Sequence, residues 1–200
     1  MPPGLVGAQY SIAVTCFCIL SERTHLYATW ARMGRPKTGS SSVEVLEMKI
    51  VWSCRQFDEL DTQDLYGLLQ LRAEIFIVEQ DCAYQDVDGF DHEALHVMGL
   101  LSASDESSLV SYARLLPPGA KYEGASIGRV VTKKSARGSG IGKALMLNSL
   151  AFCKEHWPGE VITISAQLYL QQFYIELGFE TESEPYDEDG IPHIRMQLNP

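Results

Sequence analysis

One stretch constrains the fold of this 200-residue chain more than any other: a glycine-rich turn between a strand-like run and a helix-like run. The sequence passes from "SIGRVVT" through "KKSARGSGIG" to "KALMLNSLAFCKEHW", and "VITISA" follows after Pro158-Gly159. A strand, a glycine turn, a helix and a second buried strand make a crossover unit, in which two strands of one sheet run parallel. The sequence therefore predicts an α/β chain with a parallel strand pair near its centre.

Alternation and helical periodicity predict the elements on either side of this unit. Strands are expected at "MKIVWSC", "HVMGLLSA" and "LVSYARLLP", the last two as a hairpin. Helices are expected at "DTQDLYGLLQLRAEIF" and "QLYLQQFYIEL", the second closed by Gly178. "FETESEPY" and "HIRMQL" are expected to pair across "DEDG". The predicted order is β-α-β-β-β-α-β-α-β-β.

The first 47 residues differ from the rest. Residues 1–43 carry a net charge of +3, from Arg23, Arg32, Arg35 and Lys37 against Glu22. "RTHLYATWARMGRPKTGSSS" is basic and rich in hydroxyl groups, as transit peptides are, whereas "SIAVTCFCIL" lacks the positive flank of a secretory signal. We expect residues 1–47 to be a poorly ordered extension and residues 48–200 to be the folded domain. The expected location is the cytoplasm, or an organelle if the extension is a transit peptide.

Charge and cysteine content exclude several functions. The net charge is −10, so phosphate repels the chain and nucleic acid is not an expected partner, whereas cationic amines or basic peptides are attracted. Five cysteines, an odd number without a C-x-x-C pair, indicate free thiols and no zinc or other metal site. No apolar run approaches the roughly 20 residues of a membrane span.

The glycine turn predicts an anion site. The first N–H groups of a helix lack internal partners, and glycines let an anion approach the backbone. Five basic residues surround the turn with no acid between Glu123 and Glu155, which favours several phosphates: Arg129, Lys133, Lys134, Arg137 and Lys143. The P-loop pattern fails at Ala144, and the dinucleotide pattern fails at Lys143.

"GASIG", residues 124–128, matches the nucleophile elbow of serine hydrolases, with Ser126 as the nucleophile. That motif needs a strand before the serine and a helix after it. Here a Pro/Gly loop precedes and a strand follows, so a serine hydrolase is not favoured.

Several motifs together resemble the GNAT superfamily of acyl-CoA-dependent N-acetyltransferases. Residues 137–142, "RGSGIG", after "GRVVT" resemble its motif A, and "QLYLQQFYIELGF" resembles its later helix. "LYGLLQLRAEIFIVEQDCAYQDVDGFD" and "YDEDGIPHIRM" resemble the ElaA-type branch. The resemblance covers Met48 to the C-terminus. It implies an α/β (α+β) fold: a GNAT-like mixed, mostly antiparallel sheet with a central, splayed parallel strand pair and helices on both faces.

The resemblance also implies acetyl-CoA as co-substrate, bound in the gap between the splayed strands. The backbone of Val130, Val131 and Thr132 would pair with the pantetheine arm. Gln167 stands where the family more often has Asn. The pyrophosphate would rest on the glycine turn: Arg137, Gly138, Ser139, Gly140, Ile141 and Gly142.

The implied chemistry is direct attack of an amine on the thioester. A lysine-like amine is protonated at neutral pH, so a base is required. The Val131 amide is expected to stabilise the oxyanion, and Tyr174 to act as general acid toward the leaving thiolate. Five residues are candidates for the base, with Glu79 as the tentative choice: Glu79, Asp88, Asp91, His96 and His193.

Two acidic stretches stand out, residues 79–93 and 180–189. The first contains Cys82, Tyr84 and Phe90 and is expected to help form an acceptor site that favours cations, whereas the second is expected to be solvated surface. Asp88, Asp91 and His193 are the tentative substrate-binding residues. An EF-hand calcium loop is rejected, because Phe90 and Val97 stand where ligands are needed. Arg72 and Glu79 share a helix face, either as a structural pair or at the edge of the acceptor cleft.

The function expected from the sequence is acetyl-CoA-dependent acetylation of a primary amine, on a small molecule or a protein, by a monomer or homodimer without a membrane or nucleic-acid partner. The alternatives are a non-catalytic acyl-CoA-binding or regulatory module and, more remotely, an enzyme like the acyl-homoserine-lactone synthases.

Overall fold

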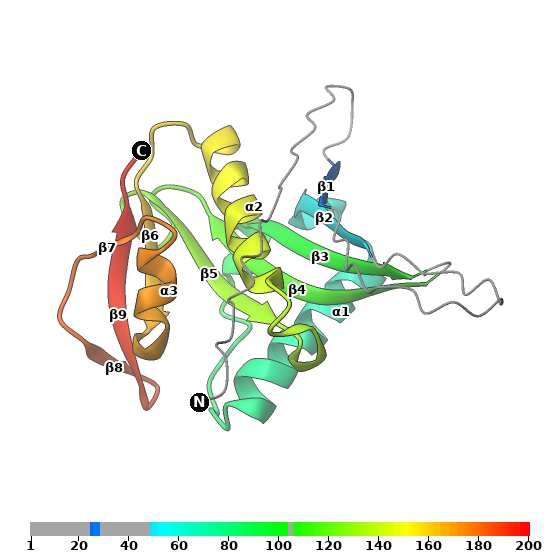
Figure 1. Ribbon diagram of the computed structural model, residues 1–200, viewed down its shortest axis with the longest axis horizontal. Helices are drawn as coiled ribbons and strands as arrows, with labels where there is room; N and C mark the ends of the chain where they lie inside the picture. Colours follow the sequence, from blue (N-terminus) through cyan, green and yellow to red (C-terminus); the bar gives the residue numbers. More distant parts are fainter. Residues whose placement is uncertain (1–24, 29–48, 104–105) are drawn as a thin grey trace, which may run out of the picture.

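The computed structural model describes residues 25–28, 49–103 and 106–200. They form a sheet of nine strands in the order β1-β2-β3-β4-β5-β6-β9-β7, with β8 paired to β9. Helices cover both faces of this sheet (Figure 1). Apart from β1, the predictions for residues 1–47 lie outside the described residues.

The first half of the sheet is an antiparallel meander. Its strands are β1 (His25–Ala28), β2 (Lys49–Gln56), β3 (Leu95–Ala103), β4 (Glu106–Leu116) and β5 (Ala125–Thr132). Consecutive buried residues in β3 and β4, at 95–99 and 110–116, fit strands that are covered on both faces of the sheet.

The second half joins the first through the only parallel pairing among the described strands. β6 (Ile162–Gln167) runs parallel to β5, and β9 (Ile191–Leu198) lies antiparallel to β6 along its whole length. The short strands β7 (Glu180–Thr181) and β8 (Tyr186–Glu188) complete this half, with β8 and β9 forming a hairpin.

One face of the first half is covered by α1 (Thr62–Arg72). Asp61 caps this helix by accepting a 2.8 Å hydrogen bond from the Asp64 amide. The helix continues as a π-helical turn, Ala73–Glu79, a form that often occurs at functional sites. Its apolar side packs on the sheet around the buried Tyr112.

The opposite face carries α2 (Ile141–His156) and α3 (Gln171–Ile175), which follows a 3₁₀ turn at Leu168–Leu170. Leu145 and Met146 of α2 and Tyr174 of α3 join one apolar core that spans both halves of the sheet. The two halves are therefore held together on this side by packing, although few strand hydrogen bonds connect them.

The predicted fold is confirmed, including the central parallel pair. The observed order has one more strand at the start, β1, and the predicted strand "FETESEPY" is divided into β7 and β8. Two helices differ from expectation. The first extends past Phe76 as the π-helical turn to Glu79, and the third is regular for only five residues before Gly178 takes a positive φ of 95°. The C-terminal segments pair through the β8–β9 hairpin as expected, because Gly190 supplies the turn.

Candidate active site

The two central strands separate soon after they meet. β5 and β6 are paired only at Ala125–Ile162 and Ser126–Thr163. In the described part of the chain, the edge of β5 from Ile127 onward has no strand partner on that side. Unpaired N–H and C=O groups along such an edge can bind an extended ligand as an added strand would.

A bulge in β5 accompanies this separation. Tyr112 pairs with Val131 and Arg114 with Gly128, so one residue of β4 lies opposite two of β5 between these pairs. Arg129, at the bulge, has a φ of 52°, which is uncommon for a residue with a side chain. Bulges of this kind bend a strand and often lie beside active sites.

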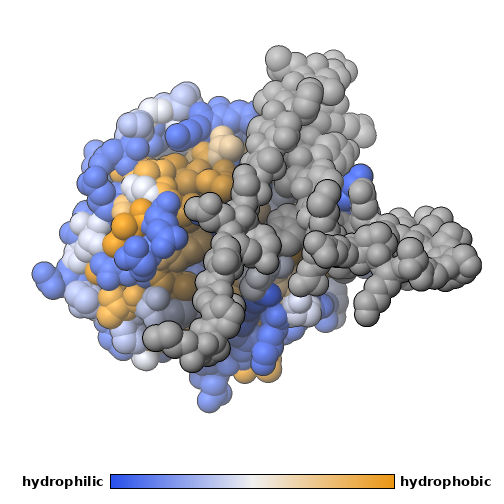
Figure 2. Space-filling model, viewed as in Figure 1, coloured by the Kyte–Doolittle hydropathy of each residue, from blue (hydrophilic) through white to orange (hydrophobic). Residues whose placement is uncertain are grey.

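A cleft of about 590 Å³ opens where the strands diverge. Its wall includes the end of the π-helical turn, β5, the glycine turn, β6, α3 and the β8–β9 hairpin. Figure 2 shows hydrophobic surface interspersed with polar surface on the face that carries α2 and α3. Elements that are distant in sequence therefore meet at one cleft between the halves of the sheet.

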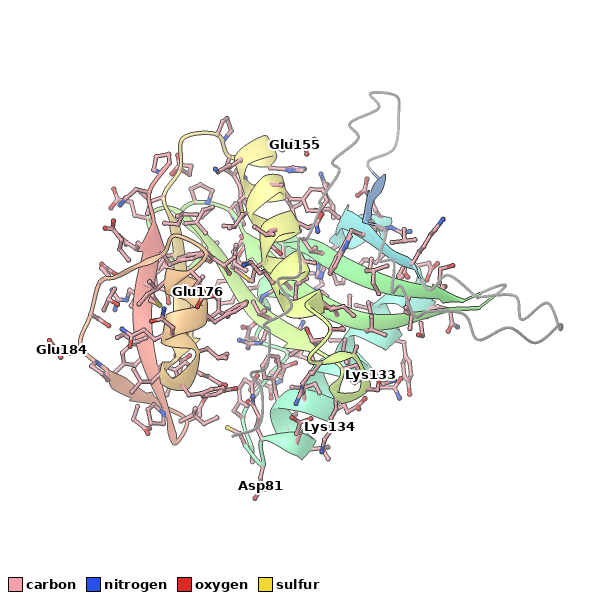
Figure 3. All side chains as sticks on the ribbon, viewed as in Figure 1. Asp81, Lys133, Lys134, Glu155, Glu176 and Glu184 are labelled. Atoms are coloured by element: carbon pink, nitrogen blue, oxygen red, sulfur yellow. The ribbon has the colours of Figure 1, made fainter. Side chains whose placement is uncertain are left out.

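The glycine turn lies at the N-terminus of α2. Gly138 and Gly140 have φ values of 76° and 85°, and a Cβ added to Gly138 would meet nothing within 4 Å. The positive φ values are therefore the reason that these two positions need glycine, and no side-chain clash requires it at Gly138. Lys133 and Lys134 lie on the same turn, near the end of the α1 segment (Figure 3). Free helix amides and positive charge together are the features that anion sites at helix N-termini share.

The structure places the six predicted turn residues in different roles. Arg137, Gly138 and Gly142 line the cleft. Ser139 donates a 2.6 Å hydrogen bond to the Ala136 carbonyl, and Gly140 is the N-cap of α2. Ile141 packs against the core. Half of the predicted set thus faces the cleft, and the other half shapes the turn.

Val131 is not placed for the oxyanion role that the sequence predicts. The Val131 carbonyl accepts a 3.1 Å hydrogen bond from Ser111 Oγ of β4. The N–H and C=O of one strand residue leave the strand on the same side, so the Val131 amide also faces β4. The edge on the cleft side belongs to Val130 and Thr132. The sequence pattern identifies the strand, but hydrogen bonding to β4 decides which amides are free.

Tyr174 lines the cleft from α3 and is 5% exposed. Its ring packs edge-on against Phe173 and Phe179, with centroids 5.1 and 5.9 Å away. Among the described residues, no group hydrogen-bonds its hydroxyl. Burial raises the pKa of Tyr174 to about 12, so the phenol stays protonated and can donate a hydrogen bond.

Residues 79–82 contact three separate parts of the cleft wall. Glu79 binds both terminal nitrogens of Arg137, one of them at 3.1 Å. The Gln167 amide donates to Gln80 Oε1 at 3.2 Å. Cys82 Sγ donates to the Asp189 carbonyl at 3.5 Å, and Asp81 between them has a φ of 51° (Figure 3). Residues 79–82, called the strap below, connect the π-helical extension of α1 with the glycine turn, β6 and the β8–β9 turn.

Glu79 is poorly suited to the predicted role of base. Hydrogen bonding from Arg137 lowers the pKa of its carboxyl, which makes the carboxylate a weaker proton acceptor. Arg137, predicted to bind pyrophosphate, is thus occupied by a carboxylate, and its Nε also donates to the Thr132 carbonyl at 2.9 Å. The sequence-level pairing of Glu79 with Arg72 is wrong, because Arg72 binds other partners.

Asp88 and Asp91 do not line the cleft; they belong to a partly buried ion cluster. The cluster contains three carboxylates and three guanidinium groups: Asp86, Asp88, Asp91, Arg72, Arg114 and Arg129. Its ion pairs measure 2.6 to 3.0 Å. Asp88 and Asp91 therefore serve to anchor their loop, which contradicts the prediction that they bind the acceptor.

The arginines of this cluster were not identified as its members from the sequence. Arg72 is fully buried at the end of α1 and binds Asp86 and Asp91 at 2.8 Å each. Arg114 and Arg129 reach the same loop from β4 and from the β5 bulge. Arginine in an otherwise apolar strand, as in "SYARLL", was the available signal, since a buried arginine needs a carboxylate partner.

The β8–β9 hairpin brings His193 and Glu188 to the cleft. His193 lies opposite Gln167 in the β6–β9 ladder, and Gln167 also lines the cleft, as its predicted cofactor role requires. Ser165 of β6 donates a 2.6 Å hydrogen bond to Glu188 Oε2. Residues from the second acidic stretch, predicted to be only solvated surface, thus contribute to the site.

Ser126 is a buried strand residue, paired with Leu116 and Thr163. It does not stand at a strand-to-helix turn, so the geometry of a nucleophile elbow is absent there.

Burial raises the pKa values of Cys54 and Cys153 to about 12, and both thiols are free.

Two kinds of site are not found in the described ranges. No group of three or more His, Cys, Asp or Glu side chains is arranged to hold a metal ion. Within the same residues, no helix has the length and apolar character needed to cross a bilayer.

Comparison with known proteins identifies the class. Residues 78–200 match the family model described as the acetyltransferase (GNAT) domain. A crystal structure of an acyl-CoA N-acyltransferase from Pseudomonas aeruginosa superposes with a TM-score of 0.67 and 41% identity, over 74% of this chain and 98% of that one. This chain belongs to the GNAT superfamily of acyl-CoA N-acyltransferases.

Within the superfamily, the relatives are of the ElaA type. Escherichia coli protein ElaA is 44% identical over 149 residues, which make up 74% of this chain and 95% of ElaA. The crystal structure of E. coli ElaA superposes with a TM-score of 0.69 over 75% of this chain and 99% of that one. The ElaA-type resemblance inferred from the sequence is therefore confirmed.

Proposed function

We propose that this chain is an N-acetyltransferase that transfers the acetyl group of acetyl-CoA to a primary amine, by direct attack within a ternary complex. One observation carries the proposal: a single cleft connects the glycine turn, the unpaired edge of β5 and Tyr174. Family membership supplies the use of acyl-CoA, and the acetyl group and the amine are the proposal's own additions.

The diphosphate end of the co-substrate would bind at the glycine turn. The first amides of α2 have no intrahelical partners, and the side of Gly138 is open space. Arg137, Lys133 and Lys134 add positive charge. Arg137 must release Glu79 to bind the diphosphate, so Glu79 acts as a competitor for the same guanidinium group.

The pantetheine arm would pair with the cleft-facing edge of β5, at Val130 and Thr132. Acetyl-CoA supplies a thioester carbonyl that an amine can attack. The Val130 amide, on the free edge beside the bulge, is the donor we assign to the developing oxyanion. The Tyr174 hydroxyl, which is protonated and has no hydrogen-bond partner among the described residues, would donate to the leaving thiolate.

The acceptor would enter from the side formed by the β8–β9 hairpin and loop 79–93. Tyr84, Tyr122, Glu188 and Asp189 line this part of the cleft. The carboxylates of Glu188 and Asp189 favour a cationic amine over an anionic acceptor. Both a small-molecule amine and a protein amine fit this proposal, as do a monomer and a homodimer.

The direct test is turnover with Tyr174→Phe as the informative variant. Acetyl-CoA is incubated with spermidine, tyramine, a lysine peptide or a peptide with a free N-terminus, and free CoA thiol is measured. Wild type should release CoA with at least one amine. Tyr174→Phe keeps the ring packing but loses the donor, so kcat should fall about 100-fold at unchanged affinity for CoA.

Other results would favour the alternatives. Tight CoA binding without release of CoA for any amine would favour a non-catalytic acyl-CoA-binding module. An acyl-homoserine lactone among the products, detected by mass spectrometry, would favour the synthase-like alternative. Full activity of Tyr174→Phe would remove Tyr174 from the mechanism and leave the acetyltransferase assignment standing.

A further inference from the structure

We propose that His193 is the general base of this site and takes the proton of the acceptor amine on its Nε2 atom. This inference rests on the proposed acetyltransferase function and adds the missing proton acceptor. Two observations carry the inference. The imidazole lies in the cleft, and a hydrogen bond decides which of its two nitrogens carries the proton when the ring is neutral.

His193 lies in β9, on the acceptor side of the cleft that also contains Tyr174. The imidazole is half-buried, and its strand neighbour across the sheet is Gln167. Tyr186 of β8 pairs with His193 in the hairpin and stacks on its ring, with centroids 6.3 Å apart and planes inclined by 28°. The ring is thus held by two strands and faces the cavity.

The Nδ1 atom of His193 lies 2.8 Å from the Ile191 carbonyl oxygen. A carbonyl oxygen can only accept a hydrogen bond, so the neutral ring must carry its proton on Nδ1. Nε2 then has a free lone pair, and no group within the described residues hydrogen-bonds it. A histidine oriented by a backbone carbonyl in this way is ready to accept a proton.

The other four base candidates are engaged elsewhere. Glu79 is bound by Arg137. Asp88 and Asp91 accept hydrogen bonds from the arginines of the ion cluster and do not reach the cleft. His96 is fully buried, with Nδ1 bonded to the Tyr112 hydroxyl and Nε2 to the Asp91 carbonyl. Of the five, only His193 has a free basic atom in the cleft.

The groups around His193 suit a transient positive charge. Tyr186 stacks on the ring, and Glu188, Asp189 and Cys82 line the same cleft. Arg195 follows two residues later in β9. β6 contributes the neutral Ser165 and Gln167. The carboxylates of Glu188 and Asp189 place negative charge on the acceptor side of the cleft, whereas Arg195 lies near Glu182, at 3.7 Å.

The protons balance as follows. An ammonium acceptor gives one proton to Nε2 of His193, and the free amine attacks the thioester carbon. The C–N bond forms, the C–S bond breaks, and the thiolate takes a proton from the Tyr174 hydroxyl. The second amine proton restores the tyrosine by way of solvent, and His193 releases its proton, so one proton leaves per turnover.

The test is His193→Gln, with His156→Gln as matched control. His156 on α2 has the same kind of contact, Nδ1 to the Phe152 carbonyl at 2.9 Å, but lies outside the cleft. With acetyl-CoA and the four amine probes above, His193→Gln should lower kcat by about 10² to 10⁴-fold at unchanged CoA affinity. The fall in rate toward acidic pH should disappear, and added imidazole should partly restore the rate. His156→Gln should behave as wild type.

Nitrogen-15 NMR of the ligand-free protein tests the same assignment without turnover, and should show the neutral ring protonated on Nδ1. A proton on Nε2, or an unchanged rate and pH profile in His193→Gln, would overturn the role of His193 while leaving the acetyltransferase intact. Wild type that binds acetyl-CoA but acetylates none of the probes would overturn both.

Discussion

The two acidic stretches of this chain are similar in composition and opposite in structure. In residues 79–93, three aspartates are drawn into the sheet by three arginines, and Asp86 and Asp91 are 6% and 5% exposed. In residues 180–189, most carboxylates point to solvent, as Glu184 does in Figure 3. Only Glu188 and Asp189 of this second stretch line the cleft. The sequence interpretation placed Asp88 and Asp91 at the acceptor site, although arginines engage both, and it left the whole second stretch to solvent, although Glu188 and Asp189 line the cleft.

The difference arises from partners that lie far away in the sequence. The guanidinium groups of Arg114 and Arg129 reach Asp88 from positions 26 and 41 residues further along the chain. A buried carboxylate is tolerated only when such partners satisfy it. A run of acids does not reveal whether it will be neutralised in the interior or left free at a binding site.

The largest expected effect that distinguishes the stretches is on stability. Arg72→Met removes the charge at similar volume and leaves Asp86 and Asp91 without their shared partner. Breaking a buried ion pair from one side costs about 3–5 kcal/mol. We expect that loss in the free energy of unfolding, measured by equilibrium denaturation in urea.

Glu184→Gln is the control from the second stretch. Its side chain is exposed, so the free energy of unfolding should change by less than about 0.5 kcal/mol. Similar stabilities for both variants would mean that the ion cluster does not hold the first stretch in place.

A smaller loss of folding stability is expected as the pH is lowered. Burial opposes ionisation, but hydrogen bonds and charges from Arg114 and Arg129 outweigh it and lower the pKa of Asp88 to about 2. Because this pKa is below that of the unfolded chain, about 3.9, the stabilisation is present above pH 4 and is lost as pH falls toward 2. Thermal unfolding from pH 7 to pH 2 should show this loss. Asp88→Asn should weaken it, and an unchanged slope in that variant would assign the acid sensitivity to other groups.

The smallest expected effect is a change in CoA affinity on substitution of Glu79, the residue of the first stretch that contacts Arg137 of the glycine turn. Glu79→Gln releases Arg137 for the diphosphate and should therefore tighten CoA binding. The expected gain is only about threefold, because an exposed ion pair contributes little free energy. Affinity for pantetheine, which lacks the diphosphate, should not change. Calorimetry with both ligands measures the difference. Unchanged CoA affinity with a lower kcat would instead return Glu79 to the role of base.

The fold and the glycine turn at the start of α2 could be predicted because their signals are local. The glycine turn, the strand before it and the helix after it are contiguous, and positive φ at Gly138 and Gly140 is what glycine permits. The structure turns the Val131 amide toward β4 rather than toward the cleft, because the direction of a strand amide depends on the bulge and on the register with β4, which the Ser111 contact reports.

The acceptor side could not be predicted in the same way. It combines loop 79–93, β6 and the β8–β9 hairpin, which the sheet order brings together only after folding. His193 was one of five base candidates in the sequence. Its selection depends on a 2.8 Å contact with Ile191 and on the engagement of the other four, which no local pattern encodes.

The most direct test of the account is CoA binding by Gly142→Asp, measured by calorimetry against wild type and Gly142→Ala. A Cβ at this position would meet only Thr132 Oγ1 at 3.8 Å, and an acid in the first turn of a helix is stabilising, so the variant should fold normally. A carboxylate about 6 Å from a phosphate charge, at an effective dielectric constant of about 20, costs roughly 2.8 kcal/mol. The account predicts CoA binding about 100-fold weaker than wild type for Asp and a much smaller loss for Ala. Equal affinity in all three proteins would contradict the claim that the diphosphate binds at the start of α2.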